Sequence, residues 1–184
     1  MSENNYIQKS FQEFQQQDAN KNLGVNIQLA EHLLKDCFDV LISLDLRPLL
    51  IFGSLLGCYR ENGLINHDLD MDIGVIGKDE MLKIKDAIDS GEFSKKGIMA
   101  IPKRCFSLVR DGFYIDIYPF LQEGDHYVSQ LGYPHYKLHQ EDFPLQTIDF
   151  LDRKFYTIKD IEKYLVKRYG KNWKTPIANK GAKG

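Results

Sequence analysis

The sequence predicts an α+β fold in which helices pack against a mixed β-sheet within one small domain. Three observations support this class. Apolar residues recur at helical spacing between residues 23 and 45. Short apolar runs at 49–52 and 71–76 have the length and composition of buried strands. An Asp-Gly pair at 111–112 separates two further apolar runs, which is a strong indication of a β-hairpin.

The predicted elements follow the chain in a clear order. They are a helix at 23–45, a strand at 49–52, a short helix at 54–60, a strand at 71–76, a helix at 79–89, hairpin strands at 105–109 and 113–118, short strands and turns at 120–157, and a last helix at 158–169. Asp79 and Thr157 are the expected N-caps of the last two helices, and Gly170 is the expected stop.

Composition excludes several classes of protein. The net charge is −2, with Lys and Arg dispersed, so neither a nucleic-acid-binding surface nor a polybasic membrane patch is expected. No apolar run reaches the roughly 18 residues of a membrane span, and the first residues do not resemble a signal peptide. The three cysteines form no zinc or disulfide pattern, which favours a cytoplasmic location. Nothing in the sequence indicates the oligomeric state.

We expect three parts along the 184 residues. Residues 1–22 are rich in Gln and Asn and are predicted to be an N-terminal arm. Residues 23–177 form the predicted domain, and the hydrophobic content of the whole chain, 43%, is enough to build its core. Residues 178–184 are small and polar, and they are expected to be a flexible tail.

Two carboxylates at alternate positions are the main indication of chemistry. If the segment from Asp70 to Ile76 is a strand, Asp70 and Asp72 project to one face, roughly 6–7 Å apart along the chain. Like charges at this spacing repel each other unless a cation lies between them. Mg²⁺ is often bound by one or two carboxylates together with substrate phosphates, and Mn²⁺ also fits such a site. A solvated pair on an edge strand is the alternative.

Other residues are candidates for the same site. Asp116, between Ile115 and Ile117, is a third metal ligand, a base for an attacking hydroxyl, or the partner in a buried salt bridge. Gly53 and Ser54 follow a strand, so they either form a capped turn or direct N–H and hydroxyl groups at a phosphate.

Three further features have two readings each. Arg60 is a phosphate clamp or a surface residue, because its forked guanidinium matches phosphate oxygens. Asp68 shares the face of Asp70 and Asp72 if the strand extends that far back, or else it caps a loop. Four aromatic residues are expected in the core, with an acceptor platform as the alternative: Tyr127, Tyr133, Tyr136 and Phe143.

Together these motifs resemble the LicD/fukutin family, within the DNA polymerase beta-like nucleotidyltransferase superfamily. The family's G-[ST]-L-L-G-x-x-R segment corresponds to Gly53–Arg60, and its D-x-D-x-D-I run corresponds to Asp68–Ile73. Its D-[IV]-[FY]-P segment corresponds to Asp116–Pro119, and its Y-L-x-x-x-Y-G-x-x-W pattern to Tyr164–Trp173. The motifs occur in matching order, so the resemblance covers residues 47–176.

The resemblance implies a minimal, single-domain nucleotidyltransferase-like fold and a metal-dependent phosphotransferase. Such an enzyme moves a phosphorylated alcohol, such as phosphocholine, ribitol phosphate or glycerol phosphate, from a CDP-linked donor to a glycan hydroxyl in surface polysaccharide or glycoconjugates. It implies Asp70, Asp72 and Asp116 as catalytic metal ligands, and Gly53, Ser54, Arg60 and Asp68 as substrate-binding residues. Two alternatives stay open. One is a nucleotidyltransferase that moves a nucleotide from a triphosphate to a small molecule or protein, and the other is a binding module without catalysis.

Overall fold

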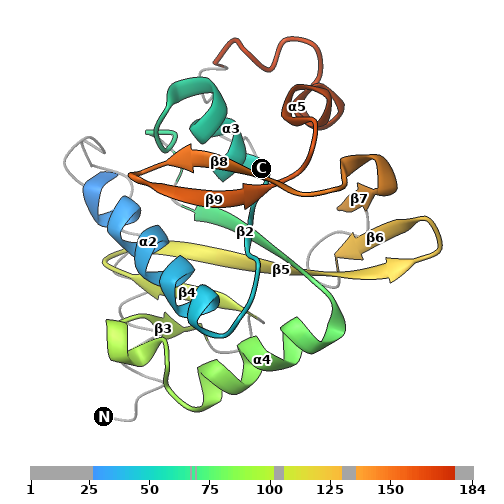
Figure 1. Cartoon of the computed structure of the whole chain (residues 1–184). Helices are drawn as coiled ribbons and strands as arrows, with labels where there is room; N and C mark the ends of the chain where they lie inside the picture. The colour runs from blue at the N-terminus through green and yellow to red at the C-terminus, as the bar shows by residue number, and fades with distance from the viewer. Residues whose placement is uncertain (1–26, 67, 69, 102–105, 130–135, 177–184) are drawn as a thin grey trace, which may run out of the picture.

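The computed structural model describes residues 27–66, 68, 70–101, 106–129 and 136–176. In this part of the chain, one mixed nine-stranded sheet is packed by four α-helices, so the predicted α+β fold is confirmed (Figure 1). The α-helices and strands are α2 (Ile27–Ser43), β1 (Leu49–Leu50), α3 (Phe52–Glu61), β2 (Asp70–Ile76), α4 (Lys78–Asp89), β3 (Met99–Ala100), β4 (Ser107–Arg110), β5 (Phe113–Glu123), β6 (His126–Ser129), β7 (Lys137–His139), β8 (Gln146–Phe150), β9 (Arg153–Thr157) and α5 (Ile161–Tyr169).

The sheet is built around the parallel pair β2 and β5. Its main path is β3-β4-β5-β2-β1-β9-β8. β1 runs antiparallel to β2 and parallel to β9, whereas β6 pairs with the distal part of β5 and with β7. The whole of β2, Asp70–Ile76, is in register with residues 114–120 of β5. This long pairing determines which β5 side chain stands beside each β2 side chain.

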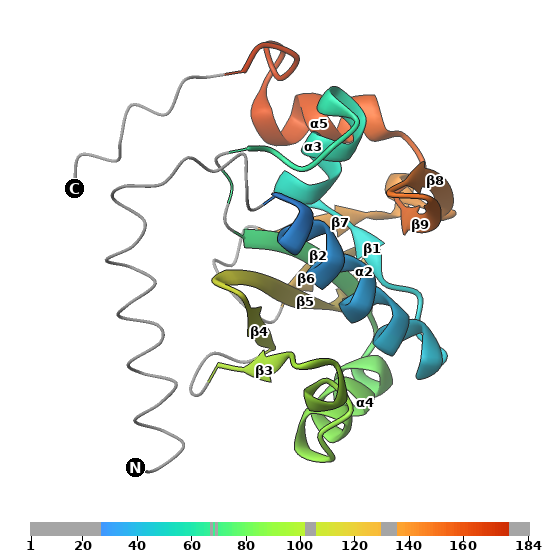
Figure 2. The same ribbon diagram turned by 90° about the vertical axis from the view of Figure 1, so that its left-hand side faces the viewer.

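One helix, α2, lies across a face of the sheet, and the other three lie at its two ends (Figures 1 and 2). α2 packs on β5, and α4 packs against β2 and β5 at the lower end of the molecule in both views (Figures 1 and 2). α3 and α5 lie together at the opposite end, above β2 (Figures 1 and 2). No helix within the described ranges combines the length and the apolar character that a membrane span needs.

The first predicted helix corresponds to α2, Ile27–Ser43. Its buried positions recur every three or four residues and form one apolar stripe: Ala30, Leu33, Leu34, Cys37, Phe38, Val40 and Leu41. Residues 23–26 of the predicted helix lie outside the described residues, as do the predicted arm at 1–22 and tail at 178–184. The domain boundaries therefore stay predictions.

The predicted hairpin is confirmed. Arg110 pairs with Phe113, which leaves Asp111 and Gly112 as a two-residue loop. Both loop residues have positive φ, 53° and 84°, as the favoured type I′ turn requires. β5 extends to Glu123, beyond the predicted end at residue 118, because its distal part pairs with β6.

The predicted cap of the last helix is wrong. Thr157 ends β9, and its hydroxyl donates to the carbonyl of Leu50 in β1 (3.2 Å). α5 begins at Ile161, and the carboxylate of Asp160 caps it by accepting the N–H of Lys163 (3.0 Å). Threonine is favoured both in strands and at helix N-caps, so the residue type alone did not distinguish these two positions.

The predicted cap of α4 is also displaced. Asp79 lies inside the first turn of α4, which starts at Lys78 and is preceded by Gly77. Gly77 has a φ of 121°, so a side chain at this position would be strained. Asp79 instead places a negative charge near the helix N-terminus, where the helix dipole favours it. The predicted stop of α5 at Gly170 is confirmed.

Candidate metal and phosphate site

The candidate site begins where β1 passes into α3. The strand predicted at 49–52 ends at Leu50, and α3 starts at Phe52 rather than at Gly53 or Ser54. Phe52 has a φ of 45°, a strained conformation for a residue with a side chain, which turns the chain sharply from strand to helix. The N–H of Gly53 donates to Oδ2 of Asp72 (3.0 Å). The first turn of α3 therefore faces the carboxylates of β2.

Three of the candidate aspartates come together on the two central strands. Asp72 of β2 is paired in register with Asp116 of β5. Asp70 is two residues before Asp72 on β2, so both project to the same face of the sheet. The parallel pairing of β2 with β5 thus brings residues that are far apart in the sequence into one cluster.

Two serines position the cluster from either side. The hydroxyl of Ser54, which is buried, accepts the backbone N–H of Asp72 (2.8 Å) and ties α3 to β2. The hydroxyl of Ser107, on β4, donates to Oδ1 of Asp116. Ser54 was predicted to contact a phosphate, but in this structure its oxygen contacts the protein backbone. The phosphate contact of Ser54 stays a prediction.

Two carboxylates approach Gly53 closely. A Cβ atom at this position would lie 2.7 Å from Oδ2 of Asp68 and 3.3 Å from Oδ2 of Asp72. Asp68 therefore faces the same turn as Asp72, although β2 begins at Asp70 and does not extend back to Asp68. Its role in substrate binding stays a prediction. A fourth carboxylate thus borders the cluster, and a side chain at position 53 would force the carboxylate of Asp68 to move.

Burial and the charges of neighbouring carboxylates raise the pKa values of Asp72 and Asp68. Burial and the charge of Asp70 raise the pKa of Asp72 to about 7, although the N–H of Gly53 and the hydroxyl of Tyr118 act in the opposite direction. Burial and the neighbouring Asp70 also raise the pKa of Asp68. Among the ion pairs of the described residues, none includes Asp68, Asp70, Asp72 or Asp116. A cation at this position would relieve the repulsion.

The donor chemistry of the cluster fits a hard divalent cation, because carboxylate oxygens are the ligands that Mg²⁺ and Mn²⁺ prefer. Among the described residues, however, no three His, Cys, Asp or Glu side chains already have the arrangement of a metal site. A site formed by Asp70, Asp72 and Asp116 would need side-chain rotation. Two carboxylates with substrate phosphates are a common alternative for Mg²⁺. The metal therefore stays a prediction.

The guanidinium of Arg60 is engaged away from the carboxylate cluster. Nη1 donates to the carbonyl of Trp173 (3.1 Å), and Nε donates to Oε1 of Glu61 (3.1 Å). These bonds hold the end of α3 to the segment after α5. For Arg60 to bind a phosphate, as predicted, it would have to exchange these partners.

Sequence reasoning missed two residues of the site. Ser107 pairs with Asp116 across the hairpin, and the two-residue loop at 111–112 already implied this register. Tyr118 lies two residues after Asp116 on the same face of β5, and burial together with the charge of Asp72 raises its pKa. Both residues could have been found by counting from the turn and by following one face of β5.

Comparison with known protein families agrees with this arrangement. The model described as "LicD/FKTN/FKRP, nucleotidyltransferase domain" matches residues 45–157, which is more than half of the chain. The chain belongs to the LicD/FKTN/FKRP family. The matched range contains α3, β2 and β5, and with them all four aspartates of the cluster. The family resemblance inferred from the motifs is therefore confirmed.

A member of this family from the mouse is similar to the chain over most of its length. "Ribitol-5-phosphate transferase FKTN" of Mus musculus is 28% identical over 159 residues, which cover 82% of this chain. The aligned region is 33% of the mouse protein, so the chain spans about a third of that relative's length.

Proposed function

We propose that the chain is a phosphotransferase that moves a phosphorylated alcohol from a CDP-linked donor to a glycan hydroxyl. The observation that carries the proposal is the cluster of Asp70 and Asp72 on β2 with Asp116 beside them on β5. Family membership and the mouse relative named as a ribitol-5-phosphate transferase support this reaction class. Phosphocholine, ribitol phosphate and glycerol phosphate are all candidates for the transferred group.

In this proposal Asp70 and Asp72 hold Mg²⁺ or Mn²⁺, with Asp116 as a third ligand. The bound ion would neutralise charge on the donor diphosphate and on the departing CMP. The Gly53 N–H and the Ser54 hydroxyl keep Asp72 in a fixed position on β2.

Asp116 has a second possible role, as the base that accepts the proton of the acceptor hydroxyl. In the structure one of its oxygens accepts the hydroxyl of Ser107, and no described residue donates a hydrogen bond to the other, which could therefore accept from the attacking hydroxyl or bind a cation. Attack of the acceptor oxygen on the phosphorus next to the alcohol forms the new phosphodiester bond, and CMP leaves with the bridging oxygen.

The family description as a nucleotidyltransferase domain favours one alternative. The same carboxylates could support attack at the α-phosphate of a nucleoside triphosphate, with transfer of the nucleotide and release of pyrophosphate. The two reactions differ in which phosphorus is attacked, so they differ in product. CMP indicates the proposed function, and pyrophosphate indicates the alternative.

The test is an incubation of the full chain with Mg²⁺ and a panel of CDP-alcohols and nucleoside triphosphates, with candidate glycan acceptors present. Release of CMP that depends on a CDP-alcohol, an acceptor and Mg²⁺ is expected. Asp72→Asn should abolish the release, whereas Asp149→Asn, a change of an exposed aspartate paired with Lys154, should not. Near-native turnover by Asp72→Asn at saturating Mg²⁺ would contradict the metal assignment. Pyrophosphate without CMP would contradict the proposed donor.

A further inference from the structure

A cavity of about 220 Å³ lies next to the carboxylate cluster, between α5, the start of α3 and the segment around β7. It is lined by residues from three parts of the chain: Phe52, Tyr136, Lys137, His139, Asp142, Tyr164, Lys167 and Arg168. Most of these residues are far apart in the sequence, so the fold creates the cavity. Its aromatic walls come from Phe52, Tyr136 and Tyr164.

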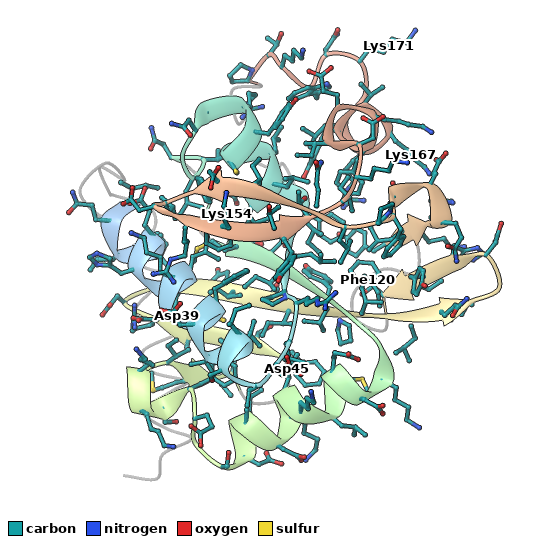
Figure 3. The ribbon with its side chains drawn as sticks, in the orientation of Figure 1. Asp39, Asp45, Phe120, Lys154, Lys167 and Lys171 are labelled. Carbon is teal, nitrogen blue, oxygen red and sulfur yellow. The ribbon has the colours of Figure 1, made fainter. Side chains whose placement is uncertain are left out.

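The cavity has an excess of positive charge. Lys137, Lys167 and Arg168 line it, against the single carboxylate of Asp142, which accepts the N–H of His139 (2.7 Å). Lys167 lies 3.8 Å from Glu141, at the outer limit of an ion pair. In Figure 3, Lys167 lies on the side of α5 toward β7, whereas Lys171 points away from the molecule. The lining therefore favours an anionic ligand.

Two aromatic rings hold the guanidinium of Arg168 in the cavity. Its Cζ lies 4.5 Å from the centroid of the Phe52 ring and 4.3 Å from that of the Tyr136 ring. The two ring centroids are only 4.7 Å apart, so both rings lie on the same side of the guanidinium. One N–H group interacts with the hydroxyl of Tyr169, and those that point away from the rings match phosphate oxygens. No carboxylate among the described residues forms an ion pair with Arg168.

A second observation points to a ligand in the same cavity. The Tyr164 side chain, 6% exposed, lines the cavity, and its hydroxyl has no hydrogen-bond partner among the described residues. The backbone N–H of Phe52 lies close to this hydroxyl but does not meet hydrogen-bond geometry. A buried hydroxyl without a partner costs free energy, and a ligand oxygen would satisfy it once the lining of the cavity moves enough to expose the hydroxyl, which is buried in this structure.

The cavity and the carboxylate cluster share a wall. Phe52 lines the cavity, and the next residue, Gly53, donates its N–H to Asp72. The ring of Phe52 also contacts that of Tyr118 (5.2 Å between centroids), which lies beside Asp72 and Asp116. A ligand that extends past Phe52 would reach from the cations of α5 to the carboxylates of β2 and β5.

We propose that this cavity is a subsite for the phosphate-bearing part of the substrate, in which Arg168, Lys137 and Lys167 bind the phosphate and Tyr164 donates to an oxygen. The proposal rests on the proposed function, since it assigns a part of that reaction's substrate. The volume is smaller than the roughly 300–1,000 Å³ of a site for a drug-sized ligand, so one phosphorylated alcohol or part of a nucleotide fits better than a whole CDP-alcohol.

The test is calorimetric titration of the full chain, in EDTA, with CMP, glycerol 3-phosphate and inorganic phosphate. EDTA removes any contribution of a cation at the carboxylates. We expect an organic phosphate to bind at millimolar concentration, and Lys137→Gln or Arg168→Gln to weaken it by roughly tenfold, as for loss of a charge-assisted hydrogen bond. Lys171→Gln is the matched control and should have no effect. A preference for CMP or for glycerol 3-phosphate would identify which end of the donor the cavity takes.

Tyr164→Phe separates binding from folding. It removes only the hydroxyl without a partner, so the thermal stability of the free protein should be unchanged or higher, while affinity for the organic phosphate should fall. Any of three results would overturn the proposal. The wild type could fail to bind the organic phosphates, Lys171→Gln could lose as much affinity as the cavity variants, or inorganic phosphate could bind as tightly as the organic phosphates. These titrations measure binding without turnover. The phosphate subsite can therefore be contradicted while CMP release still supports the proposed function, and the proposed function can be contradicted while the subsite is supported.

Discussion

Replacing Asp72 by asparagine should stabilise the metal-free protein at neutral and alkaline pH. The side chain is 8% exposed, and burial with the charge of Asp70 raises its pKa from 3.8 to about 7. Because the folded state binds this proton more tightly than the unfolded state, stability falls as the pH rises through this range. A shift of this size corresponds to a penalty of about 4 kcal/mol, absent below pH 4 and complete above pH 7.

Asparagine removes the penalty and keeps most of the geometry. Its side-chain oxygen can still accept the N–H of Gly53, and its amide can donate toward Asp70 or Asp116. At about 2–4 °C per kcal/mol for a chain of this size, the variant should melt up to roughly 8–16 °C above the wild type at pH 8. Near pH 4 the two proteins should melt at similar temperatures.

The assay is thermal unfolding followed by circular dichroism, in EDTA, from pH 4 to pH 8.5. The difference between variant and wild type is the quantity of interest, because titrating groups away from the cluster contribute equally to both. Asp68 does not, since burial and the charges of Asp70 and Asp72 raise its pKa, so its relief in the variant adds to the same gain in stability. Asp149→Asn, at an exposed pair with Lys154, is the control and should change stability by less than about 1 kcal/mol at every pH. A difference that does not grow between pH 4 and pH 7, or an Asp72→Asn protein less stable at pH 8, would refute the account of the cluster.

Three further outcomes are expected. A CDP-alcohol at 100 times its dissociation constant should stabilise the wild type by about 2.7 kcal/mol, mostly in the presence of Mg²⁺. Thermal unfolding should show that Asp72→Asn loses most of this gain. An equal increase in melting temperature in EDTA would rule out a bridging metal. Asp116→Asn should release no CMP but keep a native circular dichroism spectrum, and an unfolded protein would instead indicate a structural role for Asp116. Ser107→Ala, which removes the hydroxyl that donates to Asp116, should retain part of the activity. Arg60→Ala should lower the free energy of unfolding by about 1–2 kcal/mol in urea denaturation, because the Trp173 carbonyl loses its donor, and an unchanged value would show that this bond contributes little.

Local patterns in the sequence predicted much of the fold. The apolar stripe of α2, the Asp-Gly loop at 111–112 and the stop at Gly170 each depend on residues close together in the chain. The cap at Thr157 was predicted wrongly, because the hydroxyl that could cap a helix instead bonds to Leu50, more than a hundred residues away. Such a contact exists only after β9 has paired with β1.

The candidate site was predictable to a similar extent. The spacing of Asp70 and Asp72 placed them on one face, and the motif order linked them to Asp116. The metal and substrate roles of these residues stay predictions. The cavity beside Arg168 could not be predicted, because its walls come from α3, the β7 segment and α5, and no local pattern brings these together.

The short hairpin between β4 and β5 also limits where this chain can change in length. Ser107 stands opposite Asp116 only because two residues, Asp111 and Gly112, connect the strands. One inserted residue in that loop would shift the register and turn alternate side chains to the other face of the sheet. Insertions at the loop of Gly124 and Asp125, between β5 and β6, would leave the carboxylate in place. That loop is therefore the better position for attaching a tag or a fused domain.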